Sequence, residues 1–473
     1  MKFAYFLLAA IASANPVENV LQLNRRDSFN FTNATTESLT TISLTTTVSK
    51  LTTIYPTAGS VSKASSESSA SAAGSSSVSA ADVTSAAISA VSPAPPISIS
   101  ASSSASECSS TDSPINEYGL YKNPNAIKPK AFIISMFHYE TIWYEKLDFA
   151  HNITVPGLSP LFPHVHCVTN YSICQFITGE SEINAAASVT ALMLSPLFDL
   201  SETYFLIAGI AGGDPSQVTL GSATFAEYVV QVGLEYEVDS REIPEKYNWT
   251  TGYFPYDSYE PDAYPGSWYG TEVFRVNGKL RDRAFELASN VTLSVGTAKN
   301  VAFRELYDYA PANQAPAVVK CDGVTSDTYW FGDILTSYFS NLTHTMTNGS
   351  ATFCATAQED NASMEAIMRA HLFGLADFSR VVVMRTISDF ARAPPKYDDD
   401  AINFFNNVSQ GGSYVSIENI YRAGLPFIED VLENWDTLYS VGAFKTDEYL
   451  GDVFGTLGGT PNFGPGAITE PEA

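Results

Sequence analysis

The chain has 473 residues, of which 25 are basic and 51 are acidic, and its formal net charge is −26. This length is enough for one large domain or for two or three ordinary domains with buried cores. The negative charge repels nucleic acids and anionic membrane surfaces, so the composition argues against a nucleic-acid-binding protein.

The N-terminus has the pattern of a secretory signal peptide over residues 1–14. Lys2 precedes an apolar stretch at residues 3–12, and small residues at 12–14 supply a cleavage site. The apolar stretch is too short to span a membrane, and no later run of 18 or more apolar residues occurs in the sequence. We therefore predict a secreted or cell-surface protein on the extracellular side.

Sequons for asparagine glycosylation are frequent, which agrees with that prediction. Several of them are expected to carry glycans on exposed loops, so the protein is predicted to be a glycoprotein. The sequons begin at Asn30, Asn33, Asn152, Asn170, Asn248, Asn290, Asn341, Asn348, Asn361 and Asn407.

Residues 15–126 are dominated by Ser, Thr and Ala and contain few large apolar side chains. Such a tract does not bury enough surface to offset the conformational entropy lost on ordering. We expect a disordered stalk without chemistry, then one globular domain over residues 127–457 and a C-terminal tail over residues 458–473.

Four cysteines lie in the globular part, and a fifth, Cys108, lies near its edge. Four cysteines permit three pairings, and spacing does not decide among them. We favour the two local pairs, Cys167 with Cys174 and Cys321 with Cys354. The cysteines and histidines have no zinc-like spacing, so neither a metal nor another cofactor is expected.

Apolar runs of strand length alternate with helical patterns along the globular part. This alternation predicts an α/β domain with a largely parallel sheet. The expected strands are residues 131–136, 164–168, 173–178, 204–210, 317–320 and 380–389, and the expected helices are residues 183–194, 280–291, 364–375 and 428–439. An aromatic, proline-rich insertion at residues 244–270 is expected either to act as a lid or binding loop or to pack as a surface loop.

Several of these strands are followed by residues suited to a binding site. The run 380–389 ends at Asp389, and ligands of open α/β sheets lie beyond the carboxyl ends of strands. An aspartate here also serves as an ordinary turn residue. The other candidates are His138, Tyr139 and Glu140 after the first strand, Gly209, Gly212 and Gly213 in a glycine turn, and the aromatic pair Tyr329 and Trp330.

Six segments carry a distinctive combination of motifs: I-I-S-M-F-H-Y-E-T, I-T-G-E-S-E-I-N-A-A-A, Y-F-L-I-A-G-I-A-G-G, G-T-E-V-F-R-V-N, T-A-Q-E-D-N-A-S-M-E-A and V-V-V-M-R-T-I-S-D-F. Together they resemble the fungal purine nucleoside permease family across nearly the whole globular part. More distantly, that family is similar to nucleoside phosphorylases and nucleosidases. The resemblance implies a three-layer αβα, nucleoside phosphorylase-like fold with a central mixed, largely parallel sheet.

The resemblance also implies a pair of catalytic carboxyl groups. The nucleosidase pattern V-V-x-R-x-I-S-D ends in an aspartate that protonates N7 of a purine, and Asp389 occupies that position. A purine anion leaves poorly, so an acid must donate a proton as the glycosidic bond lengthens. Glu140 matches the position at which nucleosidases keep a carboxylate that activates water.

The ribose-binding glutamate of the family corresponds to either Glu359 or Glu365. Spacing to Asp389 favours Glu365, whereas the polar run Q-E-D-N favours Glu359. Asp360 and Asn361 belong to that run and are expected at the substrate, in which case Asn361 carries no glycan. The remaining residues expected to contact substrate are His138, Tyr139, Gly209, Gly212, Gly213, Tyr329 and Trp330, the last two by stacking on the base.

Two departures from the phosphorylases put phosphate in doubt as a ligand. No arginine follows the first strand, and Ile210 replaces the serine that is usual in the glycine turn. We therefore expect hydrolysis, rather than phosphorolysis, of purine nucleosides such as adenosine or guanosine. The alternative is a non-catalytic protein that captures nucleosides and passes them to a membrane transporter.

Overall fold

The computed structural model describes residues 115, 118–120, 123–397 and 400–455. The predicted signal peptide, the predicted C-terminal tail and the predicted stalk up to residue 114 lie outside the described residues. The strands are β1 (Ala131–Ser135), β2 (Phe149–Thr154), β3 (His164–Val168), β4 (Ile173–Ile177), β5 (Tyr204–Gly213), β6 (Ala223–Ala226), β7 (Tyr228–Gln231), β8 (Glu235–Glu237), β9 (Tyr253–Pro255), β10 (Val273–Arg275), β11 (Val318–Lys320), β12 (Asp322–Thr325), β13 (Phe353–Ala357), β14 (Val381–Phe390) and β15 (Gly451–Asp452). The helices are α3 (Trp143–Lys146), α4 (Glu182–Met193), α5 (Gly278–Ala288), α6 (Ala298–Arg304), α7 (Asp333–Met346), α8 (Asp360–Leu372), α9 (Ala401–Asn407) and α10 (Gly412–Glu433), with 3-10 turns at His138–Glu140, Ser240–Glu242, Glu245–Tyr247, Phe378–Arg380 and Pro395–Tyr397 and a π-helical turn at Trp435–Tyr439.

The large sheet is mixed and has a parallel centre. Strand β1 lies between β4 and β5 and is parallel to both, and β14 is parallel to β5 on its other side. Strands β3 and β2 continue the sheet in antiparallel fashion beyond β4. Strand β13 pairs with the last residues of β5 and leads through β12, β7 and β10 to β15, while β6 joins β14 to β11. The carboxyl ends of β1, β5 and β14 therefore meet at one edge.

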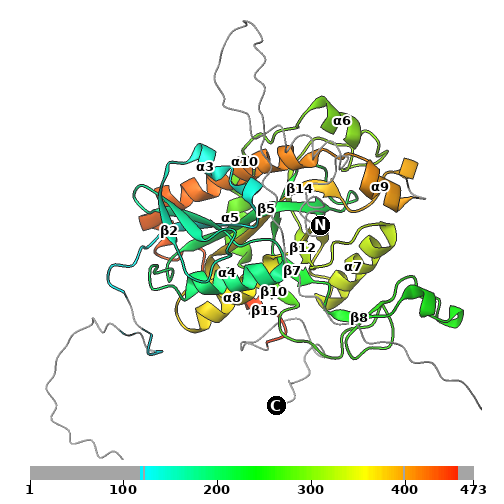
Figure 1. The fold of residues 1–473 in the computed structure, drawn as a ribbon, viewed down its shortest axis with the longest axis horizontal. Helices are drawn as coiled ribbons and strands as arrows, with labels where there is room; N and C mark the ends of the chain where they lie inside the picture. Colours follow the sequence, from blue (N-terminus) through cyan, green and yellow to red (C-terminus); the bar gives the residue numbers. More distant parts are fainter. Residues whose placement is uncertain (1–114, 116–117, 121–122, 398–399, 456–473) are drawn as a thin grey trace, which may run out of the picture. The chain divides into compact units, whose positions relative to one another are not determined.

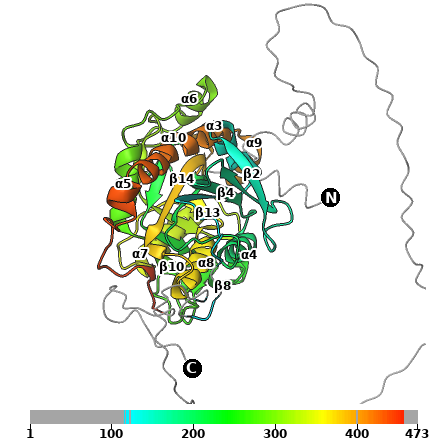
Figure 2. The same cartoon turned by 90° about the vertical axis from the view of Figure 1, so that its left-hand side faces the viewer.

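Helices cover both faces of this sheet. Phe132 and Ile134 of β1 pack with α4 and α8, whereas Ala131 and Ile133 pack with α5 and α10. Figure 2 shows α4 and α8 on one side of the strands and α5 and α10 on the other, and Figure 1 gives the same elements from a perpendicular direction. Because the central strands are buried on both faces, their sequences read as continuous apolar runs. The α/β class and the three-layer αβα arrangement agree with the prediction.

The predicted glycine turn is wrong, because β5 continues through Gly209, Gly212 and Gly213. The absent side chains allow polar neighbours to approach this strand closely. An added Cβ on Gly209 would lie 2.6 Å from Oε1 of Glu140, and one on Gly212 would lie 2.4 Å from Oγ1 of Thr356. The glycines therefore provide space beside the strand rather than a change of direction.

The last helix begins 16 residues before the predicted start, at Gly412 instead of residue 428. The helix contains Gly424 and Pro426, two residue types with low helix propensity, just before the predicted start. Ala423 and Phe427 are nevertheless fully buried against the sheet, and this packing stabilises the helix. The apolar periodicity that continues to Tyr439 belongs to the π-helical turn after α10.

The insertion at residues 244–270 packs as a surface loop. Strand β9 of the insertion pairs with β8 in a separate two-stranded sheet. The rings of Trp249 and Phe254 have centroids 5.3 Å apart, and those of Tyr256 and Tyr269 have centroids 5.0 Å apart. Within the described part of the chain, no residue of the insertion lines the cleft described below. This arrangement favours the packed-loop alternative.

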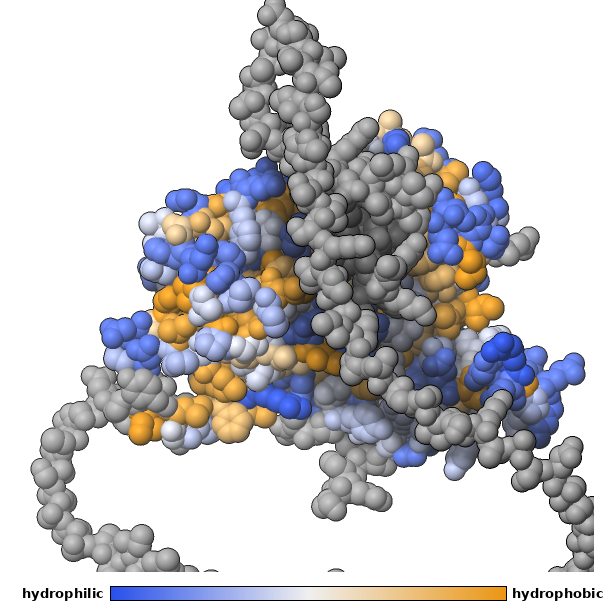
Figure 3. Space-filling model, viewed as in Figure 1, coloured by the Kyte–Doolittle hydropathy of each residue, from blue (hydrophilic) through white to orange (hydrophobic). Residues whose placement is uncertain are grey.

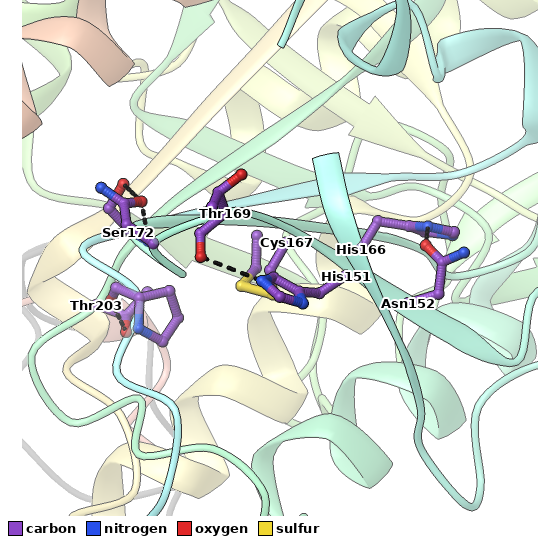
Figure 4. Close-up of a disulfide and its surroundings, with 10 residues drawn as sticks. His151, Asn152, His166, Cys167, Thr169, Ser172 and Thr203 are labelled. Atoms are coloured by element: carbon purple, nitrogen blue, oxygen red, sulfur yellow. Dashed lines mark hydrogen bonds between the residues drawn. A yellow bond between two sulfur atoms is a disulfide. The ribbon is translucent and has the colours of Figure 1, made fainter. Parts of the chain in front are cut away.

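Both favoured disulfides are present. Cys167 on β3 and Cys174 on β4 lie directly opposite each other, with their Cα atoms 4.1 Å apart. Figure 4 shows this bridge in the antiparallel edge of the sheet, next to the histidines of β2 and β3. The second bridge joins Cys321, which precedes β12, to Cys354 on β13. Each bridge thus links two neighbouring strands.

Hydrophobic and hydrophilic residues are interspersed on the face shown in Figure 3. Exposed apolar side chains include Ile183 in the first turn of α4 and Leu194 just after its last residue. Among the described residues, no helix is both long enough and apolar enough to cross a membrane.

Candidate functional site

A cleft lies at the carboxyl ends of the parallel strands, where α/β sheets bind their ligands. It encloses about 630 Å³ of space, part of it open to solvent. Its walls come from the ends of β1, β5, β12, β13 and β14 and from the residue that precedes α8. The lining residues are Met136, Phe137, Glu140, Glu180, Ile210, Ala211, Gly212, Ser326, Thr328, Tyr329, Trp330, Thr356, Ala357, Gln358, Glu359, Arg385, Ser388 and Asp389.

Asp389 lies at the end of β14, with both carboxyl oxygens next to a hydroxyl group. Tyr329 donates a hydrogen bond to Oδ2 at 2.8 Å, and Oγ of Ser388 lies 2.6 Å from Oδ1 and 3.0 Å from the carbonyl oxygen of Ala211. A serine hydroxyl has one proton, so Ser388 donates either to Oδ1 of Asp389 or to the carbonyl oxygen of Ala211. Burial raises the pKa of Asp389 and favours its protonated form, although the hydrogen bonds from Ser388 and Tyr329 oppose this shift.

Glu140 is buried in the turn that follows β1, and backbone N–H groups surround its carboxylate. Its Oε2 accepts hydrogen bonds from Met136 at 2.6 Å and Phe137 at 3.3 Å, and its Oε1 accepts one from Ile210 at 2.7 Å. Two carboxylate oxygens have about four acceptor positions, so one position on Oε1 remains for a ligand or a water molecule. Burial raises the pKa of Glu140 to about 8, although the Arg385 cation and the backbone donors oppose this shift.

Arg385 enters the cleft wall from the middle of β14. Its guanidinium donates to Glu359 at 3.0 Å, to both carboxylate oxygens of Asp360, and to the carbonyl oxygen of Ile210 at 2.9 Å. Glu359 also accepts from the backbone of Ser181 at 3.1 Å, and burial raises its pKa. Arg385 is the only cation among the lining residues, and these contacts already pair it with carboxylates of the protein.

Of the two candidates for the ribose-binding residue, Glu359 lines the cleft and Glu365 does not. Helix α8 begins at Asp360, so Glu359 lies at its start and Glu365 lies about 9 Å further along the axis. There Glu365 pairs with Arg369 one turn later. Spacing to Asp389 favours Glu365, whereas the start of α8 places Glu359 at the cleft.

Asp360 and Asn361, which were also expected at the substrate, do not line the cleft. Asp360 is fully buried behind Arg385. Asn361 accepts from the hydroxyl of Thr325 at 2.8 Å and donates to the carbonyl oxygen of Thr271 at 2.8 Å. Asn361 is 2% exposed and its amide group is hydrogen-bonded to two neighbouring segments, so it is not accessible to a glycan.

The aromatic pair lines the cleft in two different ways. Trp330 is 9% exposed and packs on Phe339, with ring centroids 4.6 Å apart. Tyr329 is 40% exposed, and its hydroxyl group reaches Asp389. Trp330 is thus held in the wall of the cleft by packing, whereas Tyr329 is the more exposed side chain of the same wall.

Four further candidates lie beside the cleft without lining it. The rings of His138 and Tyr139 lie against each other, with centroids 4.2 Å apart, in the turn after β1. Of the three glycines, only Gly212 is among the lining residues. Gly209 instead makes room for Glu140 and Arg385, and Gly213 faces Ile387 and Val218.

Sequence reasoning missed Arg385 and the polar lining residues Glu180, Ser326, Thr328, Thr356 and Gln358. A signal for Arg385 was present, because an arginine inside an apolar strand must find buried carboxylate partners. The hydroxyl residues lie on loops and short strands with no comparable signal. Among the described residues, no group of three or more His, Cys, Asp or Glu side chains is arranged to hold a metal ion.

Comparison with known proteins identifies the family. A family model described as "Purine nucleoside permease (NUP)" matches residues 128–443. The chain belongs to the purine nucleoside permease family. A purine nucleoside permease of Candida albicans is 55% identical over 349 residues, covering 73% of this chain and 85% of the relative. A probable purine nucleoside permease of Schizosaccharomyces pombe is 40% identical over 326 residues, covering 67% of this chain and 93% of the relative.

The family membership confirms the resemblance drawn from the motifs, but it overturns the predicted location. The prediction of a secreted or cell-surface protein is wrong, because the matched family and both relatives are named permeases, a name that denotes transport across a membrane. That prediction depended on residues 1–14, which lie outside the described part of the chain.

Solved structures that the chain matches in part include a nucleosidase and a hydrolase. The 5'-methylthioadenosine/S-adenosylhomocysteine nucleosidase of Neisseria meningitidis is 13% identical with a TM-score of 0.37, covering 63% of this chain and 98% of that one. The futalosine hydrolase of Helicobacter pylori is 14% identical with a TM-score of 0.36, covering 62% of this chain and 97% of that one.

Proposed function

We propose that this family member binds a purine nucleoside in the cleft and hydrolyses its N-glycosidic bond, with Asp389 as the general acid and Glu140 as the general base. The observation that carries the proposal is the place of Asp389 at the end of β14, where it lines the cleft and where burial raises the pKa of its carboxyl group. Burial favours a protonated carboxyl group at the edge of the cleft, as proton donation to a purine requires.

The proposed reaction balances with water as the second substrate. Asp389 gives its proton to N7 of the base as the bond between N9 and C1′ breaks. Water adds to C1′ and loses a proton to Glu140, so the products are the free base and the free sugar. Protonation of the leaving base is needed because the sugar becomes oxocarbenium-like before water arrives.

The register of the sheet supports a place for water between the two carboxyl groups. Glu140 contacts β5 at Gly209 and Ile210, and Asp389 pairs with Gly212. Gly212 is two residues from Ile210 and three from Gly209, and such a length of strand spans about 7 to 10 Å. Glycosidases that use a directly attacking water keep their carboxyl groups roughly 6.5–9.5 Å apart, which is a comparable spacing.

The charges in the cleft support hydrolysis over phosphorolysis. Glu140, Glu180, Glu359 and Asp389 line it with one cation, Arg385, which already contacts two carboxylates. A phosphate dianion would have to displace these partners, whereas sugar hydroxyl groups donate readily to carboxylates. Glu359, at the start of α8, is the proposed ribose ligand, and Trp330 is the proposed stacking partner of the base.

The test is the release of free base from adenosine or guanosine, with and without phosphate. We expect release without phosphate and no increase when phosphate is added. Asp389→Asn should lower the rate by about 10² to 10⁴, the usual contribution of a general acid. Asp436→Asn, which changes an exposed aspartate outside the cleft, is the matched control and should retain the wild-type rate. A rate that depends on phosphate would contradict hydrolysis.

A second candidate function is capture of a purine nucleoside that is then passed to a membrane transporter. The observation that favours it is the engagement of Glu140, whose oxygens accept three backbone hydrogen bonds and so clamp the end of β1 to β5. Nucleoside binding without base release, unchanged in Asp389→Asn, would support capture and exclude hydrolysis.

A further inference from the structure

Tyr329 donates a hydrogen bond to the proposed acid. Its Oη lies 2.8 Å from Oδ2 of Asp389, while Ser388 lies against Oδ1. Protein hydroxyl groups therefore contact both oxygens of the carboxyl group. A purine that takes a proton from Asp389 has to share or replace one of these contacts.

The surroundings of Oδ2 restrict the direction from which a ligand can reach it. On the β5 side, a Cβ added to Gly212 would lie 3.2 Å from Oδ2 and 2.4 Å from Oγ1 of Thr356. Backbone and side-chain atoms therefore occupy that side closely. Tyr329, which lines the cleft, stands on an approach to the same oxygen.

The two hydroxyl residues that contact Asp389 also differ in burial and in packing. Ser388 is 4% exposed, is a neighbour in β14 and lies within hydrogen-bond distance of the carbonyl oxygen of Ala211. Tyr329 is 40% exposed and lies in the segment between β12 and α7, which has no helix or strand. The buried ring of Trp330 anchors the next residue of that segment. Tyr329 can therefore turn away with less loss of packing than Ser388.

We propose that Tyr329 is a positioning residue whose hydroxyl group competes with N7 of a purine for Oδ2 of Asp389. The tyrosine donates to Oδ2 and holds the carboxyl group toward the cleft. When Oδ2 carries the proton of Asp389, it donates to N7 of a base, and the base displaces the phenol. This inference rests on the proposed function, because it assigns Asp389 to the base. The competition also makes the cleft select its ligands, because a base without an acceptor at position 7 gains no hydrogen bond when it displaces Tyr329.

Tyr329→Phe removes the hydroxyl group but keeps the ring, including its contact with Phe405 at a centroid distance of 5.5 Å. The probe is free adenine, which binds without being cleaved, and binding is followed by calorimetry. We expect adenine to bind about fivefold more tightly to Tyr329→Phe than to the wild type, the size expected for one hydrogen bond that no longer has to be broken. The affinity for 7-deazaadenine, which lacks N7, should change less than twofold.

The pH profile of base release provides a readout that a merely structural role would not change. A hydroxyl donor stabilises the ionised form of Asp389 and lowers its pKa, so Tyr329→Phe raises that pKa. The acid then stays protonated to higher pH, and the decline of the rate at high pH should move upward. Tyr259→Phe, which changes a tyrosine that is 90% exposed outside the cleft, is the matched control and should show neither effect.

The outcomes separate this inference from the proposed function. If the wild type binds adenine and releases it from adenosine, but Tyr329→Phe leaves adenine affinity and the pH profile unchanged or weakens binding, only the tyrosine proposal is wrong. If the wild type neither binds adenine nor releases it, both proposals are wrong. Equal unfolding midpoints for Tyr329→Phe and the wild type would exclude misfolding as the cause of any difference.

Discussion

Arg385 on β14 and Asp360 at the start of α8 form a buried ion pair behind the cleft, with Nη2 and Oδ1 2.5 Å apart and side chains 3% and 0% exposed. The same guanidinium reaches Glu359 and the carbonyl oxygen of Ile210. One cation thus joins β14, α8 and β5 at the edge where the candidate site lies. Because the two carboxylates are buried away from water, the cation of Arg385 has to compensate their negative charges in the folded protein.

Arg385→Met should strongly destabilise the fold. The substitution leaves Glu359 and Asp360 buried without their cation, and loss of one partner of a buried pair costs about 3–5 kcal/mol. We expect a decrease of that size in the free energy of unfolding measured with urea. The control is Arg422→Met, which breaks a pair with Glu418 whose side chains are 42% and 43% exposed, and should cost at most about 1 kcal/mol. Equal small losses would show that Arg385 does not support the cleft.

The central strands were predictable because each forms a continuous apolar run. Strand β3 has the expected bounds, and β14 differs from its expected range by one residue at each end. The short strands β6, β7, β10, β12 and β13 were not predicted, since strands of three to five residues are defined by their distant partners more than by their own sequences. The early start of α10 was hidden by Gly424 and Pro426, whose helical state depends on tertiary packing.

The site was predictable where it follows the ends of central strands. Asp389, Glu140 and Gly212 line one cleft because β14, β1 and β5 are parallel neighbours. Arg385 was not predicted, because its role depends on partners at the start of α8, 25 and 26 residues earlier in the chain. The choice between Glu359 and Glu365 likewise needed the first residue of α8, and helix boundaries are poorly defined by sequence.

Gly212→Ala should block the cleft without unfolding the domain. The added Cβ would lie 2.4 Å from Oγ1 of Thr356 and 3.2 Å from Oδ2 of Asp389, so at least one of these groups must move. A displacement of about 1 Å at a reacting group can lower a rate by about 100-fold, and we expect base release to fall by this amount. The matched control is Gly323→Ala, whose Cβ would meet its nearest atom at 3.8 Å. A normal rate in Gly212→Ala would place the reaction elsewhere.

Glu235 on β8 should make the stability of the protein depend on pH. Its Oε1 accepts a hydrogen bond from Tyr338, its Oε2 is buried without a hydrogen-bond partner, and burial raises its pKa from 4.5 to about 8. Between these values the folded state holds a proton that the unfolded state has lost, so this contribution to stability falls as pH rises from about 5 to 8. In Glu235→Gln, urea unfolding between pH 5 and 9 should lack this fall. Glu237→Gln, on the same strand but exposed, should retain it, and identical pH profiles for all three proteins would contradict the assignment.

The two disulfides should stabilise the fold unequally, because they close loops of different length. Cys321 and Cys354 are separated by 33 residues, and Cys167 and Cys174 by 7. In the loop-entropy model, a bridge restricts the unfolded chain by about 3.7 kcal/mol for the longer loop and about 2.4 kcal/mol for the shorter one. We therefore expect the double replacement Cys321→Ser with Cys354→Ser to lower the free energy of unfolding more than Cys167→Ser with Cys174→Ser. The two double variants are each other's control, since both remove one bridge between neighbouring strands and leave buried serines. A larger loss for the shorter loop would mean that native packing around Cys167, rather than chain entropy, sets the contribution of the bridge.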